Sequence, residues 1–313
     1  RQRQMCIRDR YNMATGILNA AGNSKKPLVY LAIASFTNII LDLLFIKIFK
    51  LGVMGAAIAT DISQAISCIL AIGYLLKVKS DYKLYIKDLK INKETAVKII
   101  KIGLPTAIQN MVISFSNVLV QSSVNAYGAT AMAGYAAYLK IDGFNILPVL
   151  SISMAVTTFT GQNVGANRLD RVKKGMYSSL IMVLVYTVFI GAVLLIFSHQ
   201  VLGLFTHSAQ VIMYGQLAMK YFCPYYFLLG ILNVLAGTVR GAGKGIPPMI
   251  ILLFSMCIFR ILWIKIALPF YSSIDGVFIL YPISWLVGAI LMILYTKFGK
   301  WLPHKQMEKK ENS

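Results

Sequence analysis

The chain of 313 residues is 58% hydrophobic and only 13% charged, with a mean hydropathy of +0.69. This composition excludes a soluble globular domain and indicates a protein that crosses a membrane several times. The net charge of +20 does not indicate a nucleic-acid-binding protein, because the basic residues lie between long apolar runs rather than on a soluble face.

Apolar runs long enough to cross a bilayer recur along the chain. A spanning helix needs about 20 apolar residues at a rise of ~1.5 Å per residue. From Tyr11 the chain is predicted to form the end of one membrane helix and then eight complete spans, at 28–49, 53–77, 99–125, 131–159, 175–198, 211–236, 248–270 and 276–298. The sequence therefore predicts an all-α, polytopic membrane protein.

The connections between these spans alternate in charge. Connection 77–101 carries eight lysines, 160–174 carries four basic residues, and the tail at 301–313 is basic as well. Connections 126–130, 199–210 and 271–275 contain no Lys or Arg. Because Lys and Arg are retained in the cytoplasm, we expect the basic connections and the C-terminus inside and the others outside.

An aspartate lies near the middle of the first complete span. A carboxylate at that depth costs roughly 2.5 to 3.5 kcal/mol, so it is retained where it faces protein or water. Ser35, Asn38 and Asp42 are spaced i, i+3, i+7, which places them on one face of a helix. Asp42 is therefore a candidate functional residue. The alternative is a polar pair, Asn38 and Asp42, that is hydrogen-bonded into a helix interface.

The sequence repeats itself at a shift of 221 residues. The shift aligns Asn12, Gly16, Gly22 and Pro27 with Asn233, Gly237, Gly243 and Pro248. Both copies have the same predicted orientation, which indicates a parallel repeat about an axis along the membrane normal. We therefore expect 11–77 to be the second part of a first lobe, 78–97 a cytoplasmic linker, 98–300 a second lobe and 301–313 a cytoplasmic tail.

The repeat also predicts that the chain is truncated at its N-terminus. The counterpart of the second lobe's first helices would lie before residue 1. Residues 1–10, RQRQMCIRDR, contain four arginines and no apolar run, whereas the segment they align with in the second lobe is almost entirely apolar. We interpret residues 1–10 as non-native.

Five segments resemble the multidrug and toxic compound extrusion (MATE) family. In chain order they are GVMGAAIATDISQ (52–64), KIGLP (101–105), AYLKIDGFNILP (137–148), GQNVGANRLDRVKKG (161–175) and GTVRGAGKGIPP (237–248). The resemblance extends from Tyr11 to about Lys300. It implies two six-helix lobes, so that eight complete helices of an original twelve are present here.

The resemblance also implies a function. Members of this family export organic cations, including drugs and toxic metabolites, in exchange for Na⁺ or H⁺ by alternating access. We expect a multi-pass protein in the inner membrane of a prokaryote, with membrane lipid and small organic cations as partners. We expect a monomer that binds no nucleic acid and needs no cofactor besides the coupling ion.

Three residues match a cation site found in archaeal and bacterial members of the family. That site combines an Asn and an Asp four residues apart, a Thr eighteen residues later and an Asp on the first helix. Asn38, Asp42 and Thr60 match this spacing, whereas the first-helix Asp has no counterpart in this chain. Na⁺ at these residues is the only metal site that we expect. Asp61 is excluded, because neighbouring residues do not share a helix face.

Another branch of the family has an ion site in its second lobe that uses a Glu on the seventh helix, and the second lobe of this chain lacks that residue. Span 99–125 contains no acidic residue. Its polar residues, predicted to line a cavity, are Gln109, Asn110, Ser114, Asn117 and Gln121, with hydrogen bonding between helices as the alternative. Lys140 and Asp142 lie inside span 131–159. Two residues apart they do not face each other, and we expect each to have another partner and a gating or coupling role.

Other classes of function are less well supported. The three histidines lie in an outer connection or the tail, and the sequence shows no arrangement of a nucleophile with a general base. We therefore do not expect an enzyme. The four cysteines lack metal-binding spacing. A lipid-linked or polysaccharide flippase of the same superfamily remains as an alternative. It would need a cationic cavity, yet away from the ends of these spans the only basic residues are Lys140, Lys220, Arg260 and Lys265.

Overall fold

The computed structural model describes residues 2–80, 82–85, 87, 90 and 92–302. These residues form helices and turns, with no strand among them. Eight of the helical segments in this part are long and apolar enough to cross a membrane, and they confirm the eight predicted spans. The chain divides into two compact units, Arg1–Asn92 and Lys93–Ser313.

The first unit contains three helices. They are α1 (Gln2–Ala20), α2 (Lys25–Leu43), which continues as a π-helical turn (Leu44–Ile48), and α3 (Gly52–Lys77). Both α1 and α2 pack against α3. The contact uses small residues, since a Cβ atom at Gly55 would lie 2.9 Å from the Cβ of Phe45. α1 includes most of 1–10, whose non-native origin stays a prediction.

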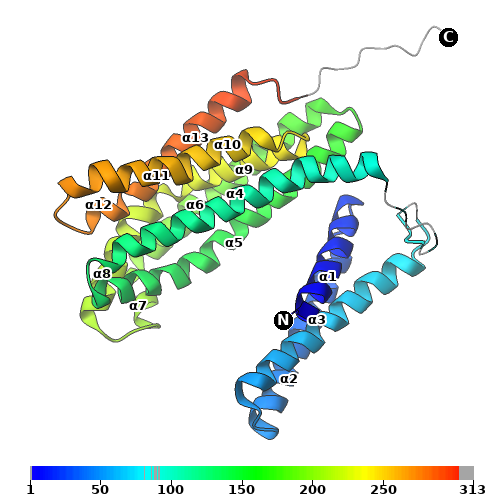
Figure 1. Ribbon diagram of the computed structural model, residues 1–313, viewed down its shortest axis with the longest axis horizontal. Coiled ribbons are helices and arrows are strands. Elements are labelled where there is room, and N and C mark those ends of the chain that lie inside the picture. The colour runs from blue at the N-terminus through cyan, green and yellow to red at the C-terminus, as the bar shows by residue number, and fades with distance from the viewer. Residues whose placement is uncertain (1, 81, 86, 88–89, 91, 303–313) are drawn as a thin grey trace. The chain divides into compact units, whose positions relative to one another are not determined.

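The second unit contains the remaining helices (Figure 1). They are α4 (Lys93–Asn125), α5 (Ala129–Gly165), α6 (Leu169–Ile196), α7 (Ser198–Gly203), α8 (Ala209–Phe222), α9 (Tyr226–Gly241), α10 (Ile246–Leu253), α11 (Phe259–Leu262), α12 (Asp275–Phe278) and α13 (Leu280–Phe298). The 3₁₀ turns Cys223–Tyr225 and Leu268–Phe270 and the π-helical turns Phe254–Ile258 and Trp263–Ala267 join some of them. α5 lies at the centre of this unit and packs against α6, α8 and α9.

The contact between α5 and α9 is close because α9 has glycine where the two helices meet. A Cβ atom at Gly237 would lie 2.7 Å from the carbonyl oxygen of Ser153. Hydroxyl groups of α5 bridge the two helices: Ser153 Oγ donates to the carbonyl of Asn233 at 2.7 Å, and Thr157 Oγ1 donates to that of Gly237 at 2.9 Å. Small residues and interhelical hydrogen bonds of this kind hold helices together in lipid, where burial of apolar groups gives no driving force.

Two boundaries differ from the sequence prediction. α4 begins at Lys93, inside the segment expected to be a linker, because the amphipathic residues before the span continue its helix. The predicted span 211–236 is divided into α8 and α9 by a 3₁₀ turn at Cys223–Tyr225. Pro224 lies in this turn, and proline removes a helical N–H and crowds the preceding turn.

The 221-residue repeat extends to backbone geometry. α1 and α9 are each followed, two residues after the helix ends, by a glycine with positive φ, at +80° for Gly22 and +84° for Gly243. Gly22 N donates to Asn19 O and Asn23 N to Leu18 O, and the same pair of bonds recurs from Gly243 to Arg240 and from Lys244 to Val239. These are the two hydrogen bonds of a Schellman C-cap. α2 and α10 then begin at equivalent positions, Lys25 and Ile246.

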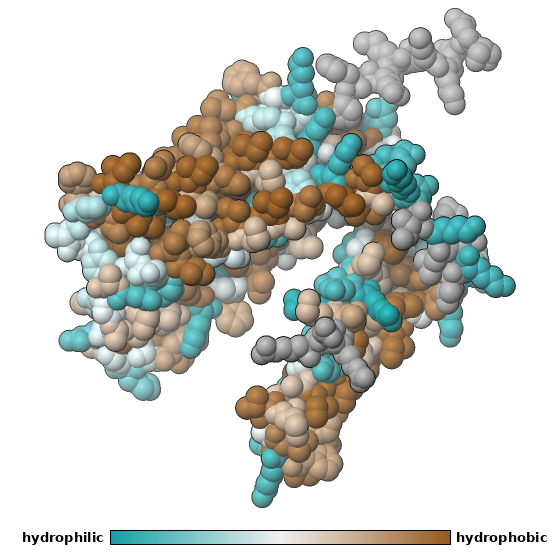
Figure 2. Space-filling view, in the orientation of Figure 1, coloured by the Kyte–Doolittle hydropathy of each residue, from teal (hydrophilic) through white to brown (hydrophobic). Residues whose placement is uncertain are grey.

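The surface of the second unit is apolar along the helices. Figure 2 shows hydrophobic side chains over α4, α10 and α11, with hydrophilic side chains towards the helix ends. Exposed apolar residues include Met111, Phe115 and Val118 of α4. A large apolar surface around a buried core is typical of a protein whose solvent is lipid. All four cysteines are free thiols, and three of them are buried.

Candidate functional site

A polar cavity of about 440 Å³ lies within the first unit. It is bounded by α1, α2 and α3. Its lining is mostly polar or small and consists of Arg8, Tyr11, Asn12, Leu31, Ala34, Ser35, Asn38, Thr60, Ser63, Gln64 and Ser67. Ser63 and Ser67 turn their hydroxyl groups back onto the carbonyl groups of Thr60 and Gln64. The cavity wall thus combines polar side chains from all three helices of this unit.

Two of the three predicted ion-coupling residues line this cavity. Asn38 and Thr60 are both on its wall, and Asp42 lies one helical turn beyond Asn38 on α2, outside the lining. Thr60 Oγ1 donates to the carbonyl of Ala56 at 2.9 Å, which leaves its lone pairs available. Among the described residues, the buried atoms Asn38 Nδ2 and Asp42 Oδ1 have no hydrogen-bond partner.

The unpartnered atoms favour one of the two interpretations of Asp42. A structural pair would hydrogen-bond Asn38 to Asp42, and buried polar atoms without partners are rare and unfavourable. The structure instead leaves both atoms unbonded. A carboxylate oxygen without a donor can accept a proton or ligate a hard cation. No cluster of three His, Cys, Asp or Glu occurs in the described part of the chain.

Gln64 is a cavity residue that the sequence reasoning missed. It lines the cavity, and its Oε1 is buried without a partner among the described residues. The signal was present, because Gln64 follows Thr60 by four residues and so lies on the same helix face. Asp61 also has a buried oxygen, Oδ1, without a partner in the described part. It is absent from the lining, as its position next to Thr60 predicted.

The predicted cavity-wall residues of the second unit have different surroundings. All of them, Gln109, Asn110, Ser114, Asn117 and Gln121, lie on α4. Gln109 is buried, whereas Asn117 is exposed and accepts a hydrogen bond from Arg260 Nη1 at 3.1 Å. Gln121 donates to Asn125 at 3.4 Å. Gln109 lies apart because it is one position from Asn110, about 100° around the helix.

Lys140 and Asp142 of α5 have separate partners, as their spacing predicted. Asp142 accepts a hydrogen bond from Tyr226 Oη at 2.8 Å, and the hydroxyl groups of Tyr226 and Tyr138 are 2.9 Å apart. Lys140 is exposed, with its Nζ 5.6 Å from the centre of the Phe205 ring. The structure therefore holds the half-buried carboxylate against tyrosines and leaves the ammonium group at the surface.

Arg260 is enclosed to an extent that the sequence did not indicate. Its side chain is only 2% exposed and no carboxylate of the described residues lies within 4.0 Å of it. Its Nε donates to Ser284 Oγ at 3.1 Å, and its guanidinium carbon lies 4.4 Å from the centre of the Tyr281 ring. Tyr281 in turn shares a hydrogen bond of 2.6 Å with Tyr135. This enclosure depends on four helices and has no local sequence signal.

Known proteins with similar sequence or structure are transporters. The MatE family model matches residues 105–264. The probable multidrug resistance protein YpnP of Bacillus subtilis is 29% identical over 96% of this chain and 67% of its own length. An FAD transporter of Shewanella oneidensis is 26% identical over 83% of the chain and 58% of its own length. A solved outward-facing structure of a multidrug resistance MATE family transporter superposes with a TM-score of 0.85 at 23% identity, covering 92% of this chain and 65% of that one. The chain thus spans about two thirds of the length of these relatives.

Proposed function

Because this chain belongs to the MatE family, we propose that the protein exports organic, mainly cationic, drugs or toxic metabolites in exchange for Na⁺ or H⁺. Family membership and eight apolar helices make it a multi-pass membrane transporter. We place it in the inner membrane of a prokaryote, as a monomer with its C-terminus in the cytoplasm. Membrane lipid and small organic cations are its proposed partners.

The observation that carries the proposed coupling is the polar cavity of the first unit. Asn38 of α2 and Thr60 of α3 both line it, and the carboxylate of Asp42, one turn from Asn38, has an oxygen without a donor among the described residues. We propose that Asp42 binds and releases Na⁺ or H⁺ during the transport cycle, with Asn38, Thr60 and Gln64 as neutral neighbours. An ion shifts a conformational equilibrium only through different affinities for its two states, and a carboxylate with an uncommitted oxygen can supply such a difference.

The second unit supplies the remaining proposed roles. Gln109, Asn110, Ser114, Asn117 and Gln121 are proposed to contribute to the substrate cavity or its walls. Asp142, bonded to Tyr226, is proposed to act in gating together with Lys140. Protonation of Asp142 would weaken the hydrogen bond that it accepts from Tyr226. This hydrogen bond can therefore differ between two conformations of the transporter.

The flippase alternative is less well supported by the charge distribution. A pyrophosphate-linked lipid requires accessible cationic groups near the centre of the transporter. Arg260 is buried and already bonded to Asn117 and Ser284, so it is not accessible. The FAD transporter of Shewanella oneidensis is a relative named for an anionic substrate, and it makes FAD the appropriate anionic competitor in substrate tests.

The test is Asp42→Asn in proteoliposomes that contain the transporter. This substitution keeps the size and much of the hydrogen bonding of Asp42 but removes its charge. We expect efflux of a fluorescent organic cation, driven by either a Na⁺ or a pH gradient, to fall by roughly ten-fold or more. Binding of the same cation without a gradient should change by less than about two-fold, because coupling and substrate binding use different residues.

Asp61→Asn is the matched control. It removes the same charge from the adjacent helix, and its oxygen is also without a partner among the described residues. Neither aspartate is in the cavity lining, but Asp42 follows Asn38 by one turn on the same face of α2, whereas Asp61 is next to Thr60 and lies about 100° away from it around α3. We expect its gradient-driven efflux to match that of the natural sequence. Undiminished efflux by Asp42→Asn, or an equal loss in both variants, would contradict the coupling role of Asp42.

A further inference from the structure

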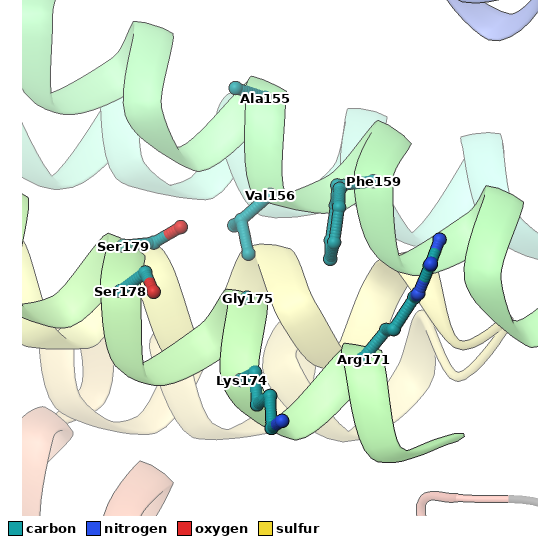
Figure 3. Close-up of a pocket in the computed structure, with 8 residues that line it drawn as sticks. All are labelled: Ala155, Val156, Phe159, Arg171, Lys174, Gly175, Ser178 and Ser179. Carbon is teal, nitrogen blue, oxygen red and sulfur yellow. The ribbon is translucent and has the colours of Figure 1, made fainter. Parts of the chain in front are cut away.

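A groove of about 590 Å³ lies between α5 and α6 of the second unit, away from the residues discussed above (Figure 3). Its α5 side is apolar and includes Val156 and Phe159. Its α6 side is polar and includes Arg171, Lys174 and Ser178. The groove thus joins an apolar wall to a cationic one.

Phe159 can approach α6 closely because Gly175 has no side chain. A Cβ atom at this position would overlap the ring of Phe159. Figure 3 shows Phe159 projecting from α5 towards α6, with Arg171 extending beside it. A larger residue at this position would push the ring aside and change the shape of the groove. The sequence segment GQNVGANRLDRVKKG, which the transport proposal leaves without a role, forms much of this region.

The cations of the groove are not neutralised within the described part of the chain. Asp170, the nearest acidic residue in sequence, is bonded to Arg168 at 3.4 Å. Neither Arg171 nor Lys174 has a carboxylate within 4.0 Å among the described residues. Both are exposed and lie in the first two turns of α6, where the helix dipole adds positive potential.

The position along α6 fixes the depth of the groove in a membrane. From residue 181 onwards the exposed side of α6 is apolar, with Ile181 63% and Val185 66% exposed. Residues 168–174 of the same helix are mostly charged. The groove therefore lies where hydrocarbon meets headgroups, with Arg171 and Lys174 at its headgroup end.

We propose that this groove binds an anionic glycerophospholipid. Its phosphate group contacts Arg171, with the charge of Lys174 on the next turn of α6, its ester groups lie near the hydroxyl groups of Ser178 and Ser179, and an acyl chain lies on Val156 and Phe159. Two cations with no acid beside them complement a phosphate, and the apolar wall complements the chain attached to it. A free phosphate would use only the cationic wall.

The experiment measures lipid retention by the chain purified in detergent. The protein is incubated with equal amounts of dioleoylphosphatidylglycerol and dioleoylphosphatidylcholine, washed, and its bound lipid is quantified by mass spectrometry. We expect enrichment of phosphatidylglycerol on the order of ten-fold or more, since each basic residue near a membrane surface favours anionic lipid. Arg171→Gln combined with Lys174→Gln should abolish most of that enrichment.

Two further variants separate a site from a general charge effect. Lys173→Gln with Lys300→Gln removes the same charge from exposed residues outside the groove and should keep the enrichment. Ser178→Leu keeps both cations but fills the groove, and it should lower the enrichment. Equal losses in the two double variants, or no loss in Ser178→Leu, would overturn the proposal. Displacement of the bound phospholipid by millimolar inorganic phosphate would also overturn it, since it would identify a free-anion site.

Discussion

Two membrane-embedded charged residues of this chain have opposite surroundings. Arg260 is held by Asn117, Ser284 and the ring of Tyr281. Removing it would leave those groups without their partner, which is unfavourable in a buried site. Asp42 has an oxygen with no partner among the described residues, so it can change ligands without breaking such a bond. Arg260 thus contributes to stability, and these surroundings of Asp42 support the ion exchange that we propose for it.

The role of Tyr281 beneath Arg260 can be tested by two substitutions. Tyr281→Phe keeps the ring and removes the hydrogen bond to Tyr135, so it should cost about 1 kcal/mol of unfolding free energy. Tyr281→Leu removes the ring as well, and loss of a desolvated cation–π contact adds about 2 kcal/mol. Thermal unfolding in detergent, followed by circular dichroism, should show a distinctly larger decrease in Tm for Tyr281→Leu.

Tyr271 provides a control for these substitutions. It is 39% exposed and its ring contacts that of Trp263, with no cation placed over it in the described structure. The Phe and Leu variants of Tyr271 should differ little from each other in Tm. If Phe and Leu at position 281 lowered Tm equally, the hydrogen bond would account for the whole effect and the cation–π interaction would not.

The sequence predicted some site residues and missed others for a physical reason. Helical spacing placed Asn38 on the face of Asp42, and Thr60, on the next helix, was joined to them only by resemblance to a known site. Gln64 was within reach of the same argument. Arg260 was not, because its partners come from positions 117, 281 and 284, and such distant packing leaves no periodic pattern in the sequence.

At the scale of elements, the repeated Schellman turns explain why two glycines recur 221 residues apart. Gly22 and Gly243 both have the positive φ that L-residues with a Cβ adopt at a cost. Each turn ends one helix and starts the next after a connection of four residues, at 21–24 and at 242–245. The two copies of the repeat therefore share the turn that reverses the chain between two helices, in addition to their apolar spans.

Gly243→Ala should destabilise the second unit by roughly 1 to 2 kcal/mol. No atom lies within 4 Å of the added Cβ, so the cost comes from the φ of +84° alone. Gly103→Ala is the matched control, because Gly103 lies inside α4 and also has nothing within 4 Å. That change should stabilise by about 0.5 to 1 kcal/mol. The Tm of both variants is measured. A shift of the two Tm values in the same direction would contradict the positive φ assigned to Gly243.

The elements themselves were largely predictable, because long apolar runs dictate membrane helices almost regardless of context. Interruptions within the runs were not. The π-helical turn at Trp263–Ala267 leaves the apolar pattern of its span intact, so hydropathy alone does not reveal it. The early start of α4 at Lys93 was missed because polar residues outside the hydrocarbon can extend a helix without lengthening its apolar run.

At the scale of the whole molecule, connections without Lys or Arg lie together at one end of the second unit, and basic helix ends lie together elsewhere. Tyr127 donates a hydrogen bond of 3.2 Å to the carbonyl of Ser273, which joins two connections that lack Lys and Arg. Elsewhere, a Cβ atom at Gly161 would lie 3.5 Å from the carbonyl oxygen of Gly241, at the basic ends of α5 and α9. Connections of like charge along the sequence thus lie near each other in the structure of this unit.

Cysteine labelling can establish which of these ends faces the cytoplasm. In a variant without the four native cysteines, Ala166→Cys lies in the basic connection, and Ala126→Cys and Ser272→Cys lie in the bare ones. All three positions are exposed. A membrane-impermeant maleimide should label Ala166→Cys only in everted vesicles and the other two only in intact cells, because Lys and Arg resist translocation. Labelling after permeabilisation provides the control for reactivity. If all three reacted from the same side, the alternation would be wrong, whereas an exchange of sides would preserve the alternation and reverse the orientation of the transporter.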